Sequence, residues 1–128
     1  MHYLLDTHTF LWMAAEPQQL SMRVRELVVE KSNQLGMSAA SAWEIAMLQQ
    51  LDRIQLPDIP SRFIPEALQH LNIIPVPIGF TTAISAVGLP LIHRDPFDRL
   101  IIAEALKEKL TVITKDRQFA QYGVSCLW

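Results

Sequence analysis

Four acidic residues that lie far apart in the sequence have the chemistry of a cation site. They are Asp6, Glu44, Asp98 and Asp116. Each of them alone could be a helix cap or a solvated charge. Gathered in one place, their carboxylates would repel one another and take up protons unless a cation offset their charge. One shared site therefore explains all four residues more economically than four separate roles.

The ligand atoms of this set are all oxygen, because no Cys or His stands at a spacing that suits zinc. Oxygen ligands favour hard ions, so we expect Mg²⁺ or Mn²⁺. In proteins such an ion commonly acts on phosphate esters, where it activates water and stabilises negative charge on the phosphate oxygens. The four acids thus predict metal-assisted chemistry at a phosphate group.

Asp98 lies near the start of a predicted helix. Asp95 can accept a hydrogen bond as the N-cap, and Pro96 suits the first helical position. Asp98 then shares one helix face with Ile101 and Ile102, which points its carboxylate toward the protein interior. An unpaired carboxylate there is unfavourable, so we expect a cation, a set of hydrogen-bond donors or a solvent-filled cleft in front of it.

Asp6 and Asp116 each follow a short apolar segment that reads as a strand, residues 3–5 and 110–114. Parallel strands end at one edge of a sheet, where α/β proteins place their ligand-binding crevice. That position favours a site for both acids. Each could instead be the N-cap of the helix that follows, a one-turn helix in the case of Asp116.

Glu44 heads an apolar helix stripe and has two interpretations. Ser41 and Glu44 have the S-x-x-E spacing of a capping box, which would occupy the carboxylate at the helix start. If Ser38 caps the helix instead, Glu44 lies in the second turn and is free to face a site. The spacing favours neither over the other. Trp43, beside it, is expected in the core.

Strands alternate with helices along the chain, which predicts a three-layer α/β domain with a mainly parallel sheet of four or five strands. The strand at 35–38 is weakly predicted because of Gly36, and Pro75 and Pro77 suggest that the strand at 72–78 lies at an edge. The predicted strands are 3–5, 35–38, 72–78, 110–114 and 124–127, and the predicted helices are 10–15, one from Ser21, one after Ser38, 61–71, 81–89 and 96 to about 109.

Composition limits the class of protein. The 128 residues, 50% of them hydrophobic, suit one domain over residues 1–128 with a sizeable core. The net charge of −2 neither suggests nor excludes a nucleic-acid partner. A single cysteine, Cys126, excludes an internal disulfide, and no apolar run is long enough to span a membrane. No signal peptide is visible, so we expect a cytoplasmic protein.

Four segments, in this order along nearly the whole chain, resemble the PIN-domain ribonucleases and, among them, the VapC-type toxins of bacterial type II toxin–antitoxin pairs. The segments are Leu4-Leu5-Asp6-Thr7-His8 with Leu11-Trp12; Ser41-Ala42-Trp43-Glu44-Ile45-Ala46; Leu89-Pro90 with His93-Arg94-Asp95-Pro96-Phe97-Asp98-Arg99-Leu100-Ile101-Ile102-Ala103; and Val112-Ile113-Thr114-Lys115-Asp116.

The resemblance implies a PIN-like fold whose acidic metal site consists of Asp6, Glu44, Asp98 and Asp116, with Thr114 nearby. It also implies Mg²⁺- or Mn²⁺-dependent endonucleolytic cleavage of RNA, homodimerisation, and inhibition by a cognate VapB-type antitoxin. In the family the fourth acid varies in how directly it holds the metal.

Some residues around the acids have more than one interpretation. Asp95 competes with Asp98 for the third acidic position, and the helix stripe favours Asp98, which leaves Asp95 as the N-cap. His93, Arg99 and Lys115 are candidates for binding RNA phosphates, but Arg99 and Lys115 could equally be surface charges or partners of the carboxylates. Neither His93 nor His8 is an obvious general base.

Two other classes of protein are also compatible with these acids, and the first of them likewise places acids at strand ends. A magnesium-binding signalling domain of the receiver type should end its first strand in adjacent acids, whereas Thr7 follows Asp6 here. A catalytically silent protein-interaction module would keep the acids as helix caps and bind no metal. Both remain as alternatives to the nuclease.

Overall fold

The sheet at the centre of the molecule has five strands, all of them parallel to their neighbours. The computed structural model describes residues 1–128. The strands lie in the order β3-β2-β1-β4-β5, so the first strand of the chain is the central one. Their bounds are Tyr3–Leu5 (β1), Leu35–Ser38 (β2), Ile73–Val76 (β3), Thr111–Ile113 (β4) and Cys126–Leu127 (β5).

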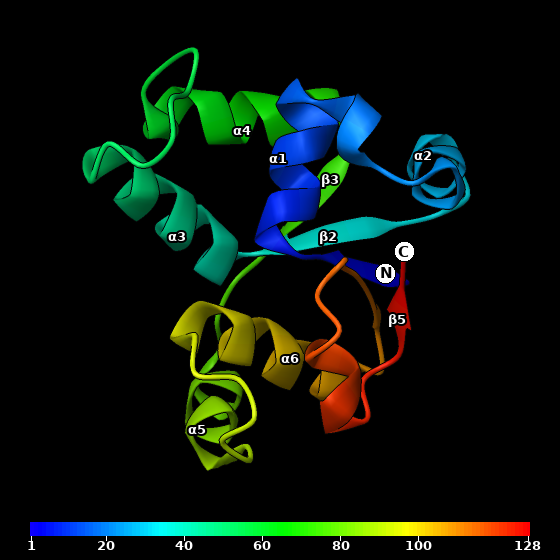
Figure 1. The fold of residues 1–128 in the computed structure, drawn as a ribbon, viewed down its shortest axis with the longest axis vertical. Helices are drawn as coiled ribbons and strands as arrows, with labels where there is room; N and C mark the ends of the chain where they lie inside the picture. The colour runs from blue at the N-terminus through cyan, green and yellow to red at the C-terminus, as the bar shows by residue number, and fades with distance from the viewer.

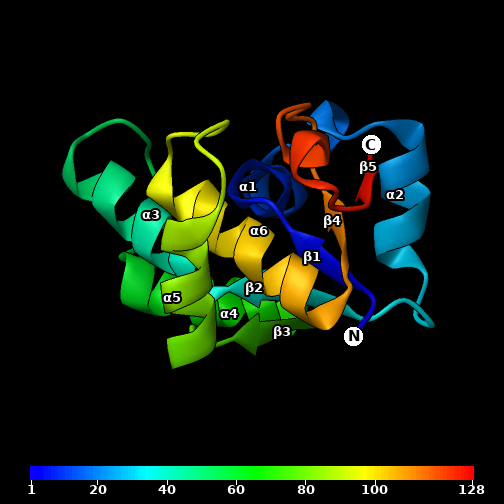
Figure 2. The ribbon, with the colours of Figure 1, turned by 90° about the horizontal axis from the view of Figure 1, so that it is seen from below.

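Six α-helices cover the two faces of this sheet and complete the predicted three-layer α/β fold. Helices α1 to α4 lie on one side and α5 and α6 on the other (Figure 1). Seen from below, α5 lies outside α6 (Figure 2). The bounds are Thr7–Ala15 (α1), Met22–Val29 (α2), Ala39–Gln50 (α3), Pro60–His70 (α4), Phe80–Gly88 (α5) and Pro96–Glu108 (α6), with short 3-10 helices at Pro17–Gln19 and Phe119–Tyr122. None of these helices has the length and apolar character that a membrane crossing requires.

Alternating side chains of the strands build a separate core on each face. Leu5 and Ile113 pack with the helices of the first side, whereas Leu4 and Val112 pack with α6. All four side chains are fully buried. This follows from the two-residue period of a strand, which sends neighbouring side chains to opposite faces. The sheet is thereby fixed from both sides, and its carboxyl edge becomes a rigid platform.

Helix caps place the starts of α1, α3 and α6. Asp6 accepts a hydrogen bond from the backbone N–H of Thr7, which starts α1 three residues earlier than the sequence predicts. Ser38 caps α3 by accepting from the N–H of Ala40, so the capping-box interpretation of Ser41 and Glu44 is wrong. Asp95 caps α6 as predicted.

Three further details differ from or qualify the predictions. Asp116 is not an N-cap, because the helix that follows begins after Gln118; Asp116 instead accepts the N–H of Gln118 in the preceding turn. Gly36 lies in an interior strand, where the Met1 thioether occupies the space that its side chain would need. Trp43 is not in the core: it is 61% exposed and packs edge-on against Phe97.

Candidate active site

A cleft at the carboxyl edge of the sheet collects the four predicted acids. Its volume is about 420 Å³. β1 and the loop after β4 supply its floor, and the starts of α1, α3 and α6 supply its walls. Five of the eight lining residues are acids, so the cleft is strongly negative. The lining residues are Asp6, His8, Trp12, Glu44, Asp95, Asp98, Lys115 and Asp116.

Asp6 is held in place through both carboxylate oxygens. Its Oδ1 accepts the backbone N–H of Thr7 at 2.6 Å, and its Oδ2 accepts the hydroxyl of Thr114 at 2.7 Å. Burial raises the pKa of Asp6, against the opposing effect of the Thr114 hydrogen bond. Asp6 is therefore both the N-cap of α1 and a residue of the cleft, two roles that the sequence analysis treated as alternatives.

Glu44 faces the cleft from the second turn of α3. The Thr7 hydroxyl lies 2.7 Å from its Oε1 and 2.9 Å from the Ser41 hydroxyl. Burial raises the pKa of Glu44; the Thr7 hydrogen bond opposes this, and the negative charges of Asp95 and Asp6 add to it. Sequence reasoning did not single out Thr7 as a partner of Glu44, because their contact depends on how α1 packs against α3.

Asp98 projects from the first turn of α6, and its side chain is only 13% exposed. Burial, followed by the charges of Asp6, Asp95, Glu44 and Asp116, raises the pKa of Asp98 to about 8. The sequence predicted that this inward-facing carboxylate needs a partner or a cleft in front of it. Asp98 has both, because it faces the cleft and contacts His93.

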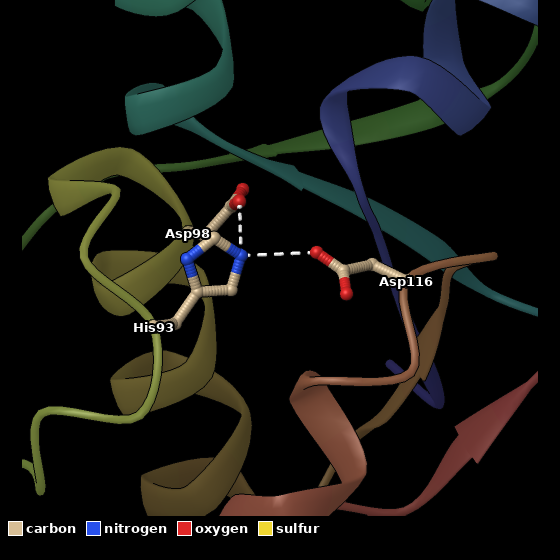
Figure 3. A group of neighbouring side chains, drawn as sticks. All are labelled: His93, Asp98 and Asp116. Carbon is tan, nitrogen blue, oxygen red and sulfur yellow. Dashed lines mark hydrogen bonds and ion pairs between the residues drawn. The ribbon is translucent and has the colours of Figure 1, made fainter.

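His93 lies between Asp98 and Asp116. Its Nε2 atom is 2.9 Å from Oδ2 of each carboxylate, and the ring points between the two acids (Figure 3). Together they form a compact group whose potential ligand atoms lie within 4.8 Å of one another. This contact could not be predicted, because the loop before α6 has no periodic pattern from which a side-chain direction could be inferred.

The two basic candidates occupy different environments. Arg99 is buried, and its guanidinium donates to five backbone carbonyls at 2.7–3.2 Å, those of Ala86, Val87, Leu89, Pro90 and His93. It is therefore neither a surface charge nor a partner of the carboxylates, and both of its terminal nitrogens, Nη1 and Nη2, donate to the backbone at the end of α5 and in the loop before α6. Lys115 is exposed and lines the cleft beside the acids.

Asp95, which the sequence analysis weighed against Asp98 and interpreted as the N-cap, also lines the cleft, as do His8 and Trp12, which the sequence analysis did not assign to the site. His8 and Trp12 are four residues apart on α1, on one helix face, and their rings lie 5.8 Å apart. That spacing, directly after the acid at the end of β1, is the signal that could have identified them.

The residues of the cleft fit a divalent cation. Five carboxylates face one lysine, and the pKa of each of Asp6, Glu44 and Asp98 is raised. A bound cation would relieve both the repulsion and the loss of hydration that raise these pKa values. Carboxylate oxygens are also the ligands that Mg²⁺ and Mn²⁺ prefer.

Comparison with known proteins identifies the class. Residues 3–124 match the PIN domain family, and the chain belongs to that family. The chain therefore combines the fold of this family with an acidic cleft at the carboxyl edge of its sheet.

The relatives are more specific. The chain is 34% identical over 122 residues to Ribonuclease VapC22 of Mycobacterium tuberculosis, covering 93% of this chain and 90% of that protein. It is thus a homologue of the VapC ribonucleases. Two solved structures share the fold: VapBC2 from Rickettsia felis bound to a DNA fragment from its promoter (TM-score 0.73, 14% identity, covering 99% of this chain and 98% of that chain) and DNA-bound VapBC from Salmonella typhimurium (TM-score 0.72, 16% identity, covering 99% and 97%).

Proposed function

We propose that this protein is a Mg²⁺- or Mn²⁺-dependent endoribonuclease and the toxin of a type II toxin–antitoxin pair. One observation carries the proposal: four carboxylates from separate parts of the chain converge in one cleft of a PIN-family fold. Its 34% identical relative is named a ribonuclease, which supports RNA as the substrate. The same family membership favours the nuclease over a receiver-type or catalytically silent module.

Asp6, Glu44 and Asp98 would hold the metal, and Asp116 would complete or orient the set. When bound, the ion supplies activated water and stabilises charge that develops on the scissile phosphate. The hydroxyls of Thr114 and Thr7 fix the carboxylates of Asp6 and Glu44 in advance, which reduces the rearrangement required on binding.

Lys115 is the basic residue in the cleft lining and would contact an RNA phosphate. The carboxylates would repel that phosphate until their charge is offset, so metal and RNA should bind with positive cooperativity. Without the ion, the site should therefore bind RNA more weakly.

A partner that blocks the site would need to match the negative cleft. An arginine of an antitoxin segment fits this requirement, because a guanidinium forms charge-assisted hydrogen bonds with carboxylates. The solved structures with this fold include complexes named VapBC, which supports a VapB-type antitoxin as that partner. A toxin that cleaves cellular RNA would act in the cytoplasm.

Homodimerisation is supported by the outer face of α5. Phe80, Ile84 and Val87, together with Leu91 just beyond the helix, are 72–91% exposed. Apolar side chains gathered on one surface mark a site of protein association. We propose that a second copy of the chain covers this face.

Replacement of one acid tests the catalytic assignment. Asp6→Asn keeps the shape and the cap but removes the charge, so we expect a folded protein that cleaves RNA at least about 100-fold more slowly. Cleavage rates of a labelled RNA in Mn²⁺ would be compared with those of Glu66→Gln, which removes an exposed charge on α4. Equal rates for Asp6→Asn and the control would contradict the assignment.

A further inference from the structure

The protonation of His93 can be read from its neighbours. Its Nδ1 lies 3.3 Å from the backbone nitrogen of Asp95, which always carries a hydrogen and can only donate. Nδ1 must therefore accept, and the ring hydrogen is on Nε2. The Nε2–H then points at the two carboxylate oxygens of Asp98 and Asp116, each 2.9 Å away, and is shared between them.

This arrangement is the opposite of the one that a metal-binding histidine needs. If Nε2 held an ion, Nδ1 would carry the hydrogen and would donate it to a carbonyl or carboxylate. In this protein Nδ1 of His93 faces a donor, the N–H of Asp95. His93 is thus suited to donating to the acids from outside a metal shell, although its nitrogen lies close enough to be mistaken for a ligand.

The loop that carries His93 is fixed by the last 3-10 helix. The Tyr122 hydroxyl accepts the N–H of His93 at 2.7 Å and that of Ile92 at 3.2 Å, and it donates to the carbonyl of Pro90 at 2.7 Å. Phe119 from the same helix packs edge-on against the His93 ring at 5.8 Å. Backbone and ring are therefore both held by residues that closely follow Asp116 in the chain.

We propose that His93 is a positioning residue of the nuclease site: its ring holds Asp98 and Asp116 together through one shared Nε2–H, and Tyr122 fixes the loop that carries it. The inference rests on the proposed function. Without the shared hydrogen bond the carboxyl groups of Asp98 and Asp116, one on α6 and one after β4, lose the contact that holds them together. Metal affinity and kcat should then fall, whereas KM for RNA at saturating metal should not change, because the Nε2–H of His93 is used by the two acids.

Two variants distinguish the loss of the Nε2–H donor of His93 from a general loss of side-chain packing. In His93→Ala we expect about a tenfold weaker affinity for Mn²⁺, measured by calorimetry on the RNA-free protein, and a similar fall in kcat. His93→Gln should recover most of both, because its amide N–H can reach the position of Nε2. His70→Ala, on the exposed end of α4, is the control. Wild-type affinity and kcat in His93→Ala would overturn the proposal.

Tyr122→Phe tests the loop without changing the site itself. Loss of the hydroxyl leaves two N–H groups without their acceptor, and we expect a three- to tenfold lower kcat with unchanged KM. A changed KM with wild-type kcat would contradict the positioning role.

A spectroscopic measurement distinguishes a positioning histidine from a ligand. Nitrogen-15 spectra of the histidine rings should show the Nε2–H form of His93 both in metal-free protein and in protein saturated with Mg²⁺. Loss of that hydrogen on Mg²⁺ binding would make His93 a ligand and overturn the inference. If the wild type bound metal but cleaved no RNA, the proposed function would fail, whereas the spectra and the Mn²⁺ affinities would still decide the role of His93.

Discussion

The surroundings of the Asp98 carboxyl group disfavour its charged form. It is buried and surrounded by other acids, and its pKa is raised to about 8. At neutral pH without metal it therefore keeps its proton. Metal binding releases that proton, which links the affinity of the site to pH. An acid whose charged form is disfavoured in this way is stabilised by a bound cation.

The raised pKa of Asp98 has a consequence for stability. The folded state binds the proton of Asp98 more tightly than the unfolded state, so its contribution to stability falls as the pH rises from about 4 to about 8. In chelator, Asp98→Asn should match the wild type near pH 4.5 and should be more stable by roughly 2–4 kcal/mol at pH 8. Urea unfolding at the two pH values measures this difference, and a variant less stable than wild type at pH 8 would contradict it.

The cleft positions of Asp6, Asp98 and Asp116 could be argued residue by residue, whereas the spacing of Glu44 left a capping box and the site open, and the neighbours of the acids could not be predicted. A helix stripe pointed Asp98 inward, and the strand ends placed Asp6 and Asp116 at one edge. The contacts of His93 and Arg99 depend on the irregular course of residues 89–95, for which no periodicity exists. Charge alone suggested a phosphate contact for Arg99, whereas burial and backbone carbonyls determine what it does.

At the scale of elements, the caps and the loop before α6 determine where the chemistry lies. Asp6, Ser38 and Asp95 start three helices at the same edge of the sheet. The strand and helix order was predictable from alternating apolar segments, and β3 lies at an edge, as its proline suggested. The exposure of Trp43 was not predictable, because a large aromatic residue usually belongs to a core. The buried face of α3 is instead formed by Ala40, Ser41, Glu44 and Ile45.

Arg99 should stabilise the loop before α6 and should not contribute to RNA binding. In Arg99→Lys one ammonium replaces a planar fork that serves five carbonyls, so several buried acceptors lose their donor. We expect a loss of about 2–4 kcal/mol of unfolding free energy, measured with urea, and an unchanged KM for RNA. A stable Arg99→Lys variant with a raised KM would restore the phosphate-binding interpretation.

The outer face of α5 predicts a change in assembly. Val87→Asp places a charge in the middle of the exposed apolar face, so the proposed dimer should dissociate. Val29→Asp is the matched control, because Val29 is also an exposed valine, at 76% against 82%, but lies on α2. Light scattering coupled to gel filtration gives the two masses. Equal masses for both variants and the wild type would remove α5 as the dimer interface.

At the scale of the whole molecule, the two cores hold the sheet rigidly from both faces, and its edge presents the acids. Parallel strands with helical crossovers bring all strand ends to one side, so segments more than a hundred residues apart meet, as Asp6 and Thr114 do. This much followed from the alternation of strands and helices. Because side-chain packing fixes the cleft, its size and the contact of Thr7 with Glu44 did not follow from the sequence, whereas the resemblance placed Thr114 near the site.

We propose that the acidic cleft is a metal-dependent ribonuclease site. The most direct test is the cleavage rate of a labelled RNA by purified protein in Mg²⁺, in Mn²⁺ and in chelator, side by side with Asp98→Asn. We expect cleavage by the wild type with either or both metals, none in chelator, and a rate at least about 100-fold lower for Asp98→Asn. Cleavage that persists in chelator, or that Asp98→Asn carries out at the wild-type rate, would contradict it.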